Sequence, residues 1–68
     1  MKLSARNQLA GKVVEIKEGE VNASVKIEIA ENTIISATIS MDAVKELGLT
    51  VGSEATAVIK ATSVMVMA

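Results

Sequence analysis

The sequence contains no cysteine, histidine, proline or aromatic residue. Without cysteine, neither a disulfide framework nor a thiolate metal site can form. Without histidine, the chain lacks the commonest transition-metal ligand and the commonest general base. The serines do not form a nucleophile elbow, and the glycines match neither the phosphate-binding loop nor the dinucleotide-binding fingerprint. We therefore expect a binding protein that is not an enzyme and has no cofactor.

The chain also lacks a large excess of either charge and any long apolar run. Its formal net charge is −1, whereas nucleic-acid-binding domains combine a basic surface with stacking aromatic side chains. The apolar stretches are all well short of the ~20 residues that span a bilayer, and the N-terminus lacks the apolar run of a secretory signal. We expect a cytoplasmic protein that binds neither nucleic acid nor membrane.

Apolar residues are abundant for a chain of 68 residues, since half of them are hydrophobic. One domain, residues 1–68, is the most that this length allows, and a domain of about 60 residues buries only about 60% of its unfolded surface. The excess apolar surface should lie between subunits, because large exposed apolar patches are rare on soluble monomers. The composition therefore predicts a homo-oligomer.

Three strands are predicted in the first 40 residues. Residues 21–29 alternate strictly between apolar and polar, which is typical of a strand with one buried face. Residues 9–17 form an earlier strand whose apolar face switches near Val13 and Val14, as in a strand that bends at a bulge. Residues 33–40 form the third strand.

A short helix should follow Ser40, which suits the N-cap position. Val44 and Leu47 are expected to face inward from this helix. Gly48 fits the left-handed position that often ends a helix, and Leu49 can then pack back on the last turn.

Two further strands are predicted over residues 54–60 and 64–67. The last one does not alternate, since all four of its residues are apolar, so both of its faces should be covered. In so small a domain, one of these faces must meet another subunit. The order of elements predicts an all-β protein, a small five-stranded OB-fold-like barrel with one short helix between strands three and four.

Two short polar segments, residues 4–7 and 60–63, flank this apolar body. Each combines one cation, Arg6 or Lys60, with alanine and small hydroxyl residues. Guanidinium and ammonium groups, hydroxyl groups and accessible backbone N–H groups together suit a tetrahedral dianion. The alternative is that both cations are ordinary surface residues and the hydroxyl groups only form turns.

Four stretches spread over the whole chain resemble the molbindin (Mop-domain) family. They are residues 4–13 (SARNQLAGKV), 21–23 (VNA), 45–49 (KELGL) and 59–65 (IKATSVM). The resemblance implies an OB-fold-like domain that binds molybdate or tungstate as the oxyanion. Since nothing in the sequence lies outside this domain, the chain resembles the free-standing members of the family.

The same resemblance implies a hexamer, built as a trimer of dimers, with anions held between subunits. Ser40 of a neighbouring subunit, at the N-terminus of the short helix, is expected to contribute to the first class of site. A second class, near the symmetry axes, is assigned to Val21 and Asn22. The first class is otherwise formed by Ser4, Ala5, Arg6, Lys60, Ala61 and Thr62.

Storage of molybdenum by passive, non-catalytic binding is the function that these expectations favour. A rigid cage of donors would reject sulfate by its smaller size. It would reject monohydrogen phosphate because the phosphate hydroxyl faces another donor, which costs about 1–3 kcal/mol. Three alternatives stay open: an assembly module that binds no anion, a molybdate sensor that signals to a partner, and an OB-fold nucleic-acid binder.

Overall fold

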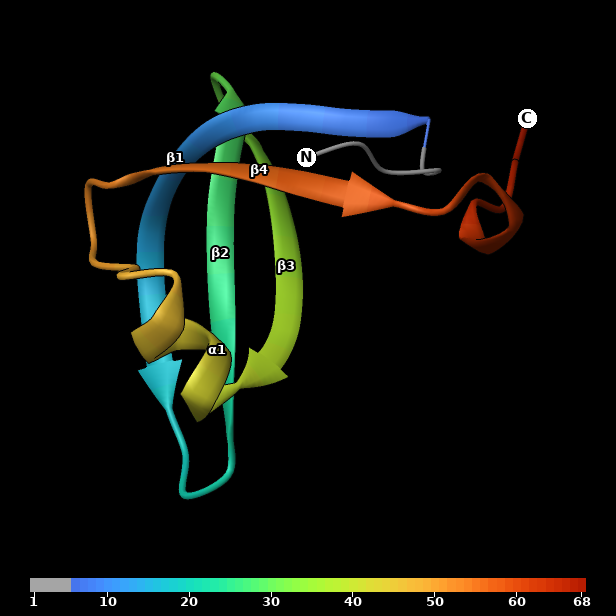
Figure 1. Ribbon diagram of the computed structural model, residues 1–68. Helices are drawn as coiled ribbons and strands as arrows, with labels where there is room; N and C mark the ends of the chain where they lie inside the picture. The colour runs from blue at the N-terminus through green and yellow to red at the C-terminus, as the bar shows by residue number, and fades with distance from the viewer. Residues whose placement is uncertain (1–5) are drawn as a thin grey trace.

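The computed structural model describes residues 6–68, which form one antiparallel sheet, a short helix and a projecting C-terminal segment (Figure 1). The strands lie in the order β3-β2-β1-β4. They are joined directly by hairpins except between β3 and β4, where the helix α1 intervenes. Their bounds are β1 Asn7–Glu18, β2 Asn22–Ala30, β3 Thr33–Ser40 and β4 Glu54–Ile59, with α1 at Met41–Glu46 and a single 3₁₀ turn, η1, at Ala61–Ser63.

Strand β1 is the longest strand and belongs to both halves of the curled sheet. Its first half pairs with β4, from Asn7↔Ile59 to Lys12↔Glu54, and its second half pairs with β2. The register shifts between Val13 and Glu15, so the predicted bulge is confirmed. The bulge bends β1, and the sheet therefore wraps into an open half-barrel (Figure 1).

Gly11 lies where β1 crosses most closely over β2. A Cβ atom added there would lie 2.2 Å from the backbone oxygen of Glu28 and 2.8 Å from its carbonyl carbon. Because both atoms belong to the backbone, they cannot swing aside as the end of a side chain could. Glycine is therefore required for the tight curl of the sheet.

The core is small and aliphatic, as the composition predicts. It lies inside the half-barrel, where leucine, isoleucine, methionine and alanine side chains pack around the buried residues. Alternate residues of β2 face inward, which confirms the buried face predicted from its period-two pattern. The six buried residues of the described chain are Val13, Ala23, Val25, Ile27, Val44 and Ala57.

Helix α1 begins and ends as predicted. The Ser40 side chain accepts a hydrogen bond from the backbone N–H of Ala43 at 3.0 Å. Gly48 has a φ of +63°, and the N–H of Leu49 donates to the carbonyl of Val44 at 3.0 Å. The inward position of Leu47 is wrong, because this residue is 68% exposed. Leu47 is the C-cap, and it lines a depression on the open side of the half-barrel, where nothing in the described part of the chain covers it.

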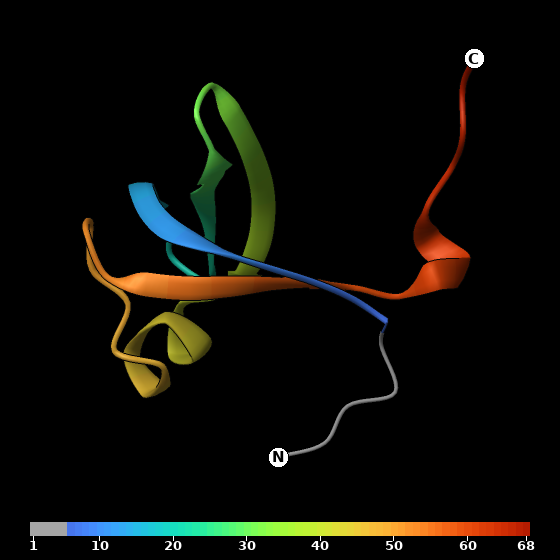
Figure 2. The ribbon, with the colours of Figure 1, turned by 90° about the horizontal axis from the view of Figure 1, so that it is seen from above.

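Two other expectations from the strand pattern are also wrong. Val21 is 73% exposed, because it lies in the turn before β2 and outside the ladder. Residues 64–68 form no strand, so the described part of the chain has four strands rather than five. Residues 64–67, the C-terminal arm, project away from the sheet (Figure 2) and pair with no strand in the described part of the chain. The predicted all-β, OB-like architecture is otherwise confirmed.

Candidate functional site

The β1–β4 ladder brings Arg6 and Lys60 to the same place. The last pair of this ladder is Asn7↔Ile59. Arg6 immediately precedes Asn7, and Lys60 immediately follows Ile59, so both cations lie at this end of the sheet. Both are exposed. Two positive charges that are 54 positions apart in the sequence thus converge because of the strand register.

Beyond Lys60 the chain makes the 3₁₀ turn η1. The hydrogen bonds of this turn run from the N–H of Ser63 to the carbonyl of Lys60 at 2.9 Å, and from the N–H of Val64 to the carbonyl of Ala61 at 3.2 Å. These bonds do not use the N–H groups of Ala61 and Thr62. Both residues are exposed, and their side chains are small. The turn therefore offers backbone donors and the Thr62 hydroxyl beside the two cations.

Ser4 and Ala5, the other residues expected in the first class of site, lie outside the described residues. The structure therefore unites four of the six residues predicted there. An additional polar contact, which the sequence did not indicate, holds their two segments together. The side-chain amide of Asn7 donates to the carbonyl of Ile59 at 3.2 Å.

Ser40, Val21 and Asn22 form a second group at the other end of β1. Asn22 and Ser40 are direct cross-strand partners, and the N–H of Met41 donates to the carbonyl of Val21 at 2.8 Å. The family resemblance assigns Ser40 to one class of site and the other two residues to another, whereas within one chain the three are neighbours. All three are exposed.

The two groups are separated by almost the whole of β1. Asn7, next to the first group, begins this 12-residue strand, and Glu18, which pairs with Ala23 next to the second group, ends it. A strand advances about 3.3 Å per residue, so even a bent strand of this length keeps the groups far apart. A tetrahedral ion a few ångströms across cannot contact both groups of the same chain.

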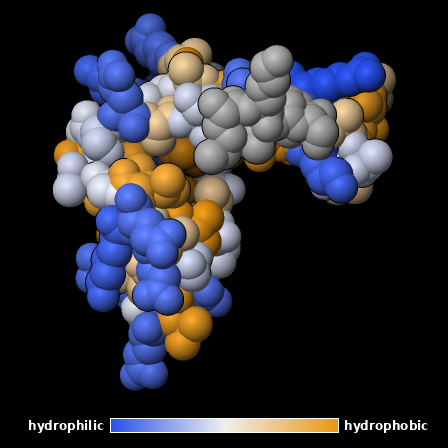
Figure 3. Space-filling model, in the orientation of Figure 1, coloured by the Kyte–Doolittle hydropathy of each residue, from blue (hydrophilic) through white to orange (hydrophobic). Residues whose placement is uncertain are grey.

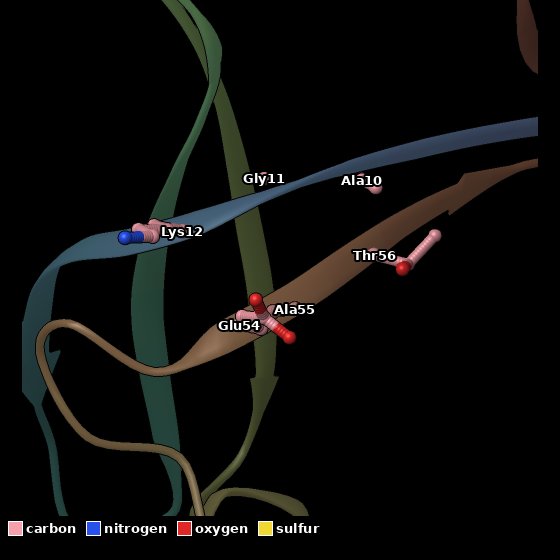
Figure 4. Close-up of a pocket in the computed structure, with 6 residues that line it drawn as sticks. All are labelled: Ala10, Gly11, Lys12, Glu54, Ala55 and Thr56. Carbon is pink, nitrogen blue, oxygen red and sulfur yellow. The ribbon is translucent and has the colours of Figure 1, made fainter.

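A broad depression of ≈ 550 Å³ lies over the β1–β4 ladder (Figure 4). Lys12 and Glu54, which are cross-strand partners, supply its only charges. Because these charges have opposite sign, the depression has no net positive charge to attract an anion. It is lined by Ala10, Gly11, Lys12, Glu54, Ala55 and Thr56, and none of these residues was predicted in the site.

A second depression of ≈ 370 Å³, here called the open groove, lies along the side where the half-barrel does not close. Its lining comes from β2, β3, β4 and the segment after α1, and it is largely apolar. β3 and β4 are the two edge strands of the sheet, and in a closed barrel another strand would lie between such edges. Residues of the groove include Val25, Ile27, Ala37, Ile39, Leu49 and Ala57.

The C-terminal arm is apolar and lies in solvent. Met65, Val66 and Met67 are 94%, 90% and 96% exposed, and Val64 is half exposed. Hydrophobic surface is visible on this projecting end beside hydrophilic surface (Figure 3). Three consecutive long apolar side chains that are almost fully exposed are unusual for a soluble monomer.

Among residues 6–68, three or more histidine, cysteine, aspartate or glutamate side chains nowhere group so as to hold a metal ion. The same part of the chain contains no helix long and apolar enough to cross a membrane.

The curled sheet carries two exposed clusters of polar groups, one near each end of β1. The chain belongs to the TOBE-domain family, whose model matches residues 3–66. It is 64% identical over 66 residues to a probable molybdenum-pterin-binding protein of Haemophilus influenzae, covering 97% of this chain and 96% of that protein. The predicted resemblance to molbindins is confirmed.

Two solved structures share the fold. A molybdate-binding protein from Sporomusa ovata superimposes with a TM-score of 0.93 at 38% identity, and the match covers the whole of both chains. The cytoplasmic molybdate-binding protein ModG, in a form with molybdate bound, superimposes with a TM-score of 0.86 at 48% identity. That match covers 90% of this chain and 43% of ModG.

Proposed function

We propose that this chain binds molybdate, and tungstate by virtue of its nearly equal size, at interfaces between identical subunits. The observation that carries the proposal is the register of the β1–β4 ladder, which places Arg6 beside Lys60 and the turn that follows it. The relatives described as molybdate-binding support the choice of ligand. The role is non-catalytic storage of molybdenum in the cytoplasm, the compartment described for ModG.

Donor chemistry supports an oxyanion in this position. Arg6 offers a planar fork of N–H donors and Lys60 a mobile point charge. Thr62 adds a hydroxyl group, and the N–H groups of Ala61 and Thr62 add fixed donors. Apart from the Thr62 hydroxyl, which can also accept, all of these groups only donate. They therefore suit molybdate and offer little to the protonated oxygen of monohydrogen phosphate.

Exchange of the C-terminal arm is the assembly that the apolar surfaces favour. The arm of one copy is exposed, and the open groove of another copy offers an apolar trough between two strand edges. Placing the arm in this groove would bury the apolar surfaces of the arm and of the groove. It would also complete the barrel with a fifth strand. Two copies exchanging arms about a twofold axis would form a closed dimer, and the family resemblance extends this to a hexamer, a trimer of such dimers.

The site is completed by a neighbouring chain in this proposal. Ser40 lies near the end of β1 opposite to Arg6, so within one chain the two residues cannot contact the same ion. The Ser40 that completes a cage therefore comes from another copy. Its oxygen already accepts the N–H of Ala43, which leaves its O–H free to donate to an anion. Val21 and Asn22 lie beside it, at the expected second class of site.

Calorimetric titration of the ligand-free protein with sodium molybdate tests this function. Saturable binding to wild type is expected, with sulfate and phosphate far weaker. Arg6→Ala should weaken molybdate binding at least tenfold, because a hydrogen bond to a charged group contributes about 1.5–3 kcal/mol. Lys12→Ala is the matched control: it removes one positive charge from β1, the strand that begins directly after Arg6, away from the proposed site. Equal losses in the two variants would show that only net charge matters.

A molybdenum–pterin compound is a second candidate ligand, favoured by the description of the Haemophilus influenzae relative. Plasma mass spectrometry of the purified protein would quantify molybdenum and tungsten, and fluorescence of the denatured extract would detect a pterin. Metal without pterin supports the oxyanion, and equimolar pterin supports the compound. A pure assembly module would carry neither, and a sensor would change its number of subunits or their packing when molybdate is added.

A further inference from the structure

Asn7 has a polar side chain that links the two segments carrying Arg6 and Lys60. It is the first residue of β1, it is half-buried, and its Nδ2 donates to the carbonyl oxygen of Ile59 at 3.2 Å. Ile59 is the last residue of β4. The bond therefore joins the residue after Arg6 to the residue before Lys60, across 52 positions of sequence.

The bond fixes the peptide unit between Ile59 and Lys60, through which the chain leaves β4 toward the η1 turn. The carbonyl of Ile59 and the N–H of Lys60 belong to one planar peptide group, so fixing the oxygen fixes the direction in which the chain leaves β4. Ends of ladders fray because the terminal residues lack a partner on one side. Asn7 supplies a side-chain donor at the last pair of the ladder, Asn7↔Ile59. Its bond opposes fraying at the point where the segments carrying Arg6 and Lys60 leave the sheet.

We propose that Asn7 is a positioning residue that sets the spacing between Arg6 and the donors of residues 60–62, and thereby the preference for molybdate over smaller oxyanions. The inference rests on the proposed function. Molybdate and sulfate carry the same charge and differ in bond length, so charge alone cannot separate them. A cage with fixed spacing can separate them, because its donors reach the larger ion and cannot close on the smaller one.

Substitution of Asn7 should therefore change selectivity as well as affinity. One neutral hydrogen bond contributes about 0.5–1.5 kcal/mol, which is about a two- to tenfold change in binding. Asn7→Ala is expected to weaken molybdate binding by about this factor and to leave sulfate binding nearly unchanged. The selectivity ratio, defined as the Kd for sulfate divided by the Kd for molybdate, should fall by the same factor.

Two further variants make the result specific. Asn7→Asp keeps the shape but faces the Ile59 carbonyl with an acceptor. Its added negative charge weakens both dianions alike, so a lowered ratio reports lost positioning even if Asn7→Ala does not fold. Asn32→Gly is the matched control, because it removes an asparagine amide in the β2–β3 turn and glycine tolerates the φ of +59° there.

Competitive titrations with molybdate and sulfate measure this ratio. They are made on samples whose oligomeric mass equals that of wild type. A lowered ratio in both Asn7 variants, with a wild-type ratio in Asn32→Gly, is the expected result. A wild-type ratio in Asn7→Asp, or in a folded Asn7→Ala, overturns the positioning role and leaves the proposed function intact. Failure of the wild-type protein to bind molybdate would instead reject the proposed function.

Discussion

Replacing Val66 by aspartate perturbs the C-terminal arm where arm exchange would bury it. Val66 is 90% exposed in the single chain, so almost its whole side chain is available for burial in a neighbour. Complete burial of a valine contributes about 1.5–3 kcal/mol. Because a twofold exchange uses the residue twice, its loss should cost about 3–6 kcal/mol per dimer. The dimer dissociation constant should rise about 140- to 20,000-fold, and more if the aspartate must be desolvated.

Sedimentation equilibrium over a wide range of protein concentration measures this change directly, and native mass spectrometry identifies the species. Val66→Ile, which keeps the apolar and β-branched character, is the control and should assemble like wild type. Val66→Asp should also lose molybdate affinity, since the proposed cage draws donors from two copies. A Val66→Asp protein with the wild-type mass and the wild-type dissociation constant would refute arm exchange.

Two more predictions concern single residues of the sheet and helix. Gly11→Ala should destabilise the fold by about 2–3 kcal/mol, because its Cβ atom would overlap the backbone of Glu28; chemical denaturation measures the loss, and an unchanged midpoint would contradict the close crossing. Ser40→Asp separates capping from anion binding, because aspartate caps helices as well as serine does but repels a dianion. Its melting temperature without ligand should stay near that of wild type while molybdate affinity falls at least tenfold, and undiminished affinity would remove Ser40 from the site.

Local structure was predictable wherever the determining residues are close in sequence. The alternation along β2, the face change at Val13 and the cap at Ser40 each depend on a few consecutive residues. The exposure of Leu47 was harder to predict, because it depends on whether the barrel closes over this residue and not on the helix pattern. The C-terminal arm has the apolar composition of a covered strand, and the pattern alone cannot tell whether its partner lies in the same chain.

The candidate site was less predictable, because it depends on register. The chemistry of Arg6 and Lys60 and the family resemblance indicate these two residues, and only the pairing Asn7↔Ile59 shows that they lie at the same end of the sheet. The pairing of Asn22 with Ser40 was not foreseen, since the register between strands is a property of the whole sheet. Asn7 was visible in the polar segment, but its bond to a carbonyl 52 residues away has no signature in the local sequence.

The order of these segments along the chain links assembly to binding. Residues 60–62 supply donors in the proposed site, and residues 64–67 form the arm proposed to enter the neighbour, with Ser63 alone between them. An arm seated in another copy would hold the η1 turn at that copy's surface, because one residue allows little independent movement. Cage and interface would therefore form together. In this scheme a monomer has low affinity for the anion even though it contains every donor, since its own Ser40 lies at the far end of β1.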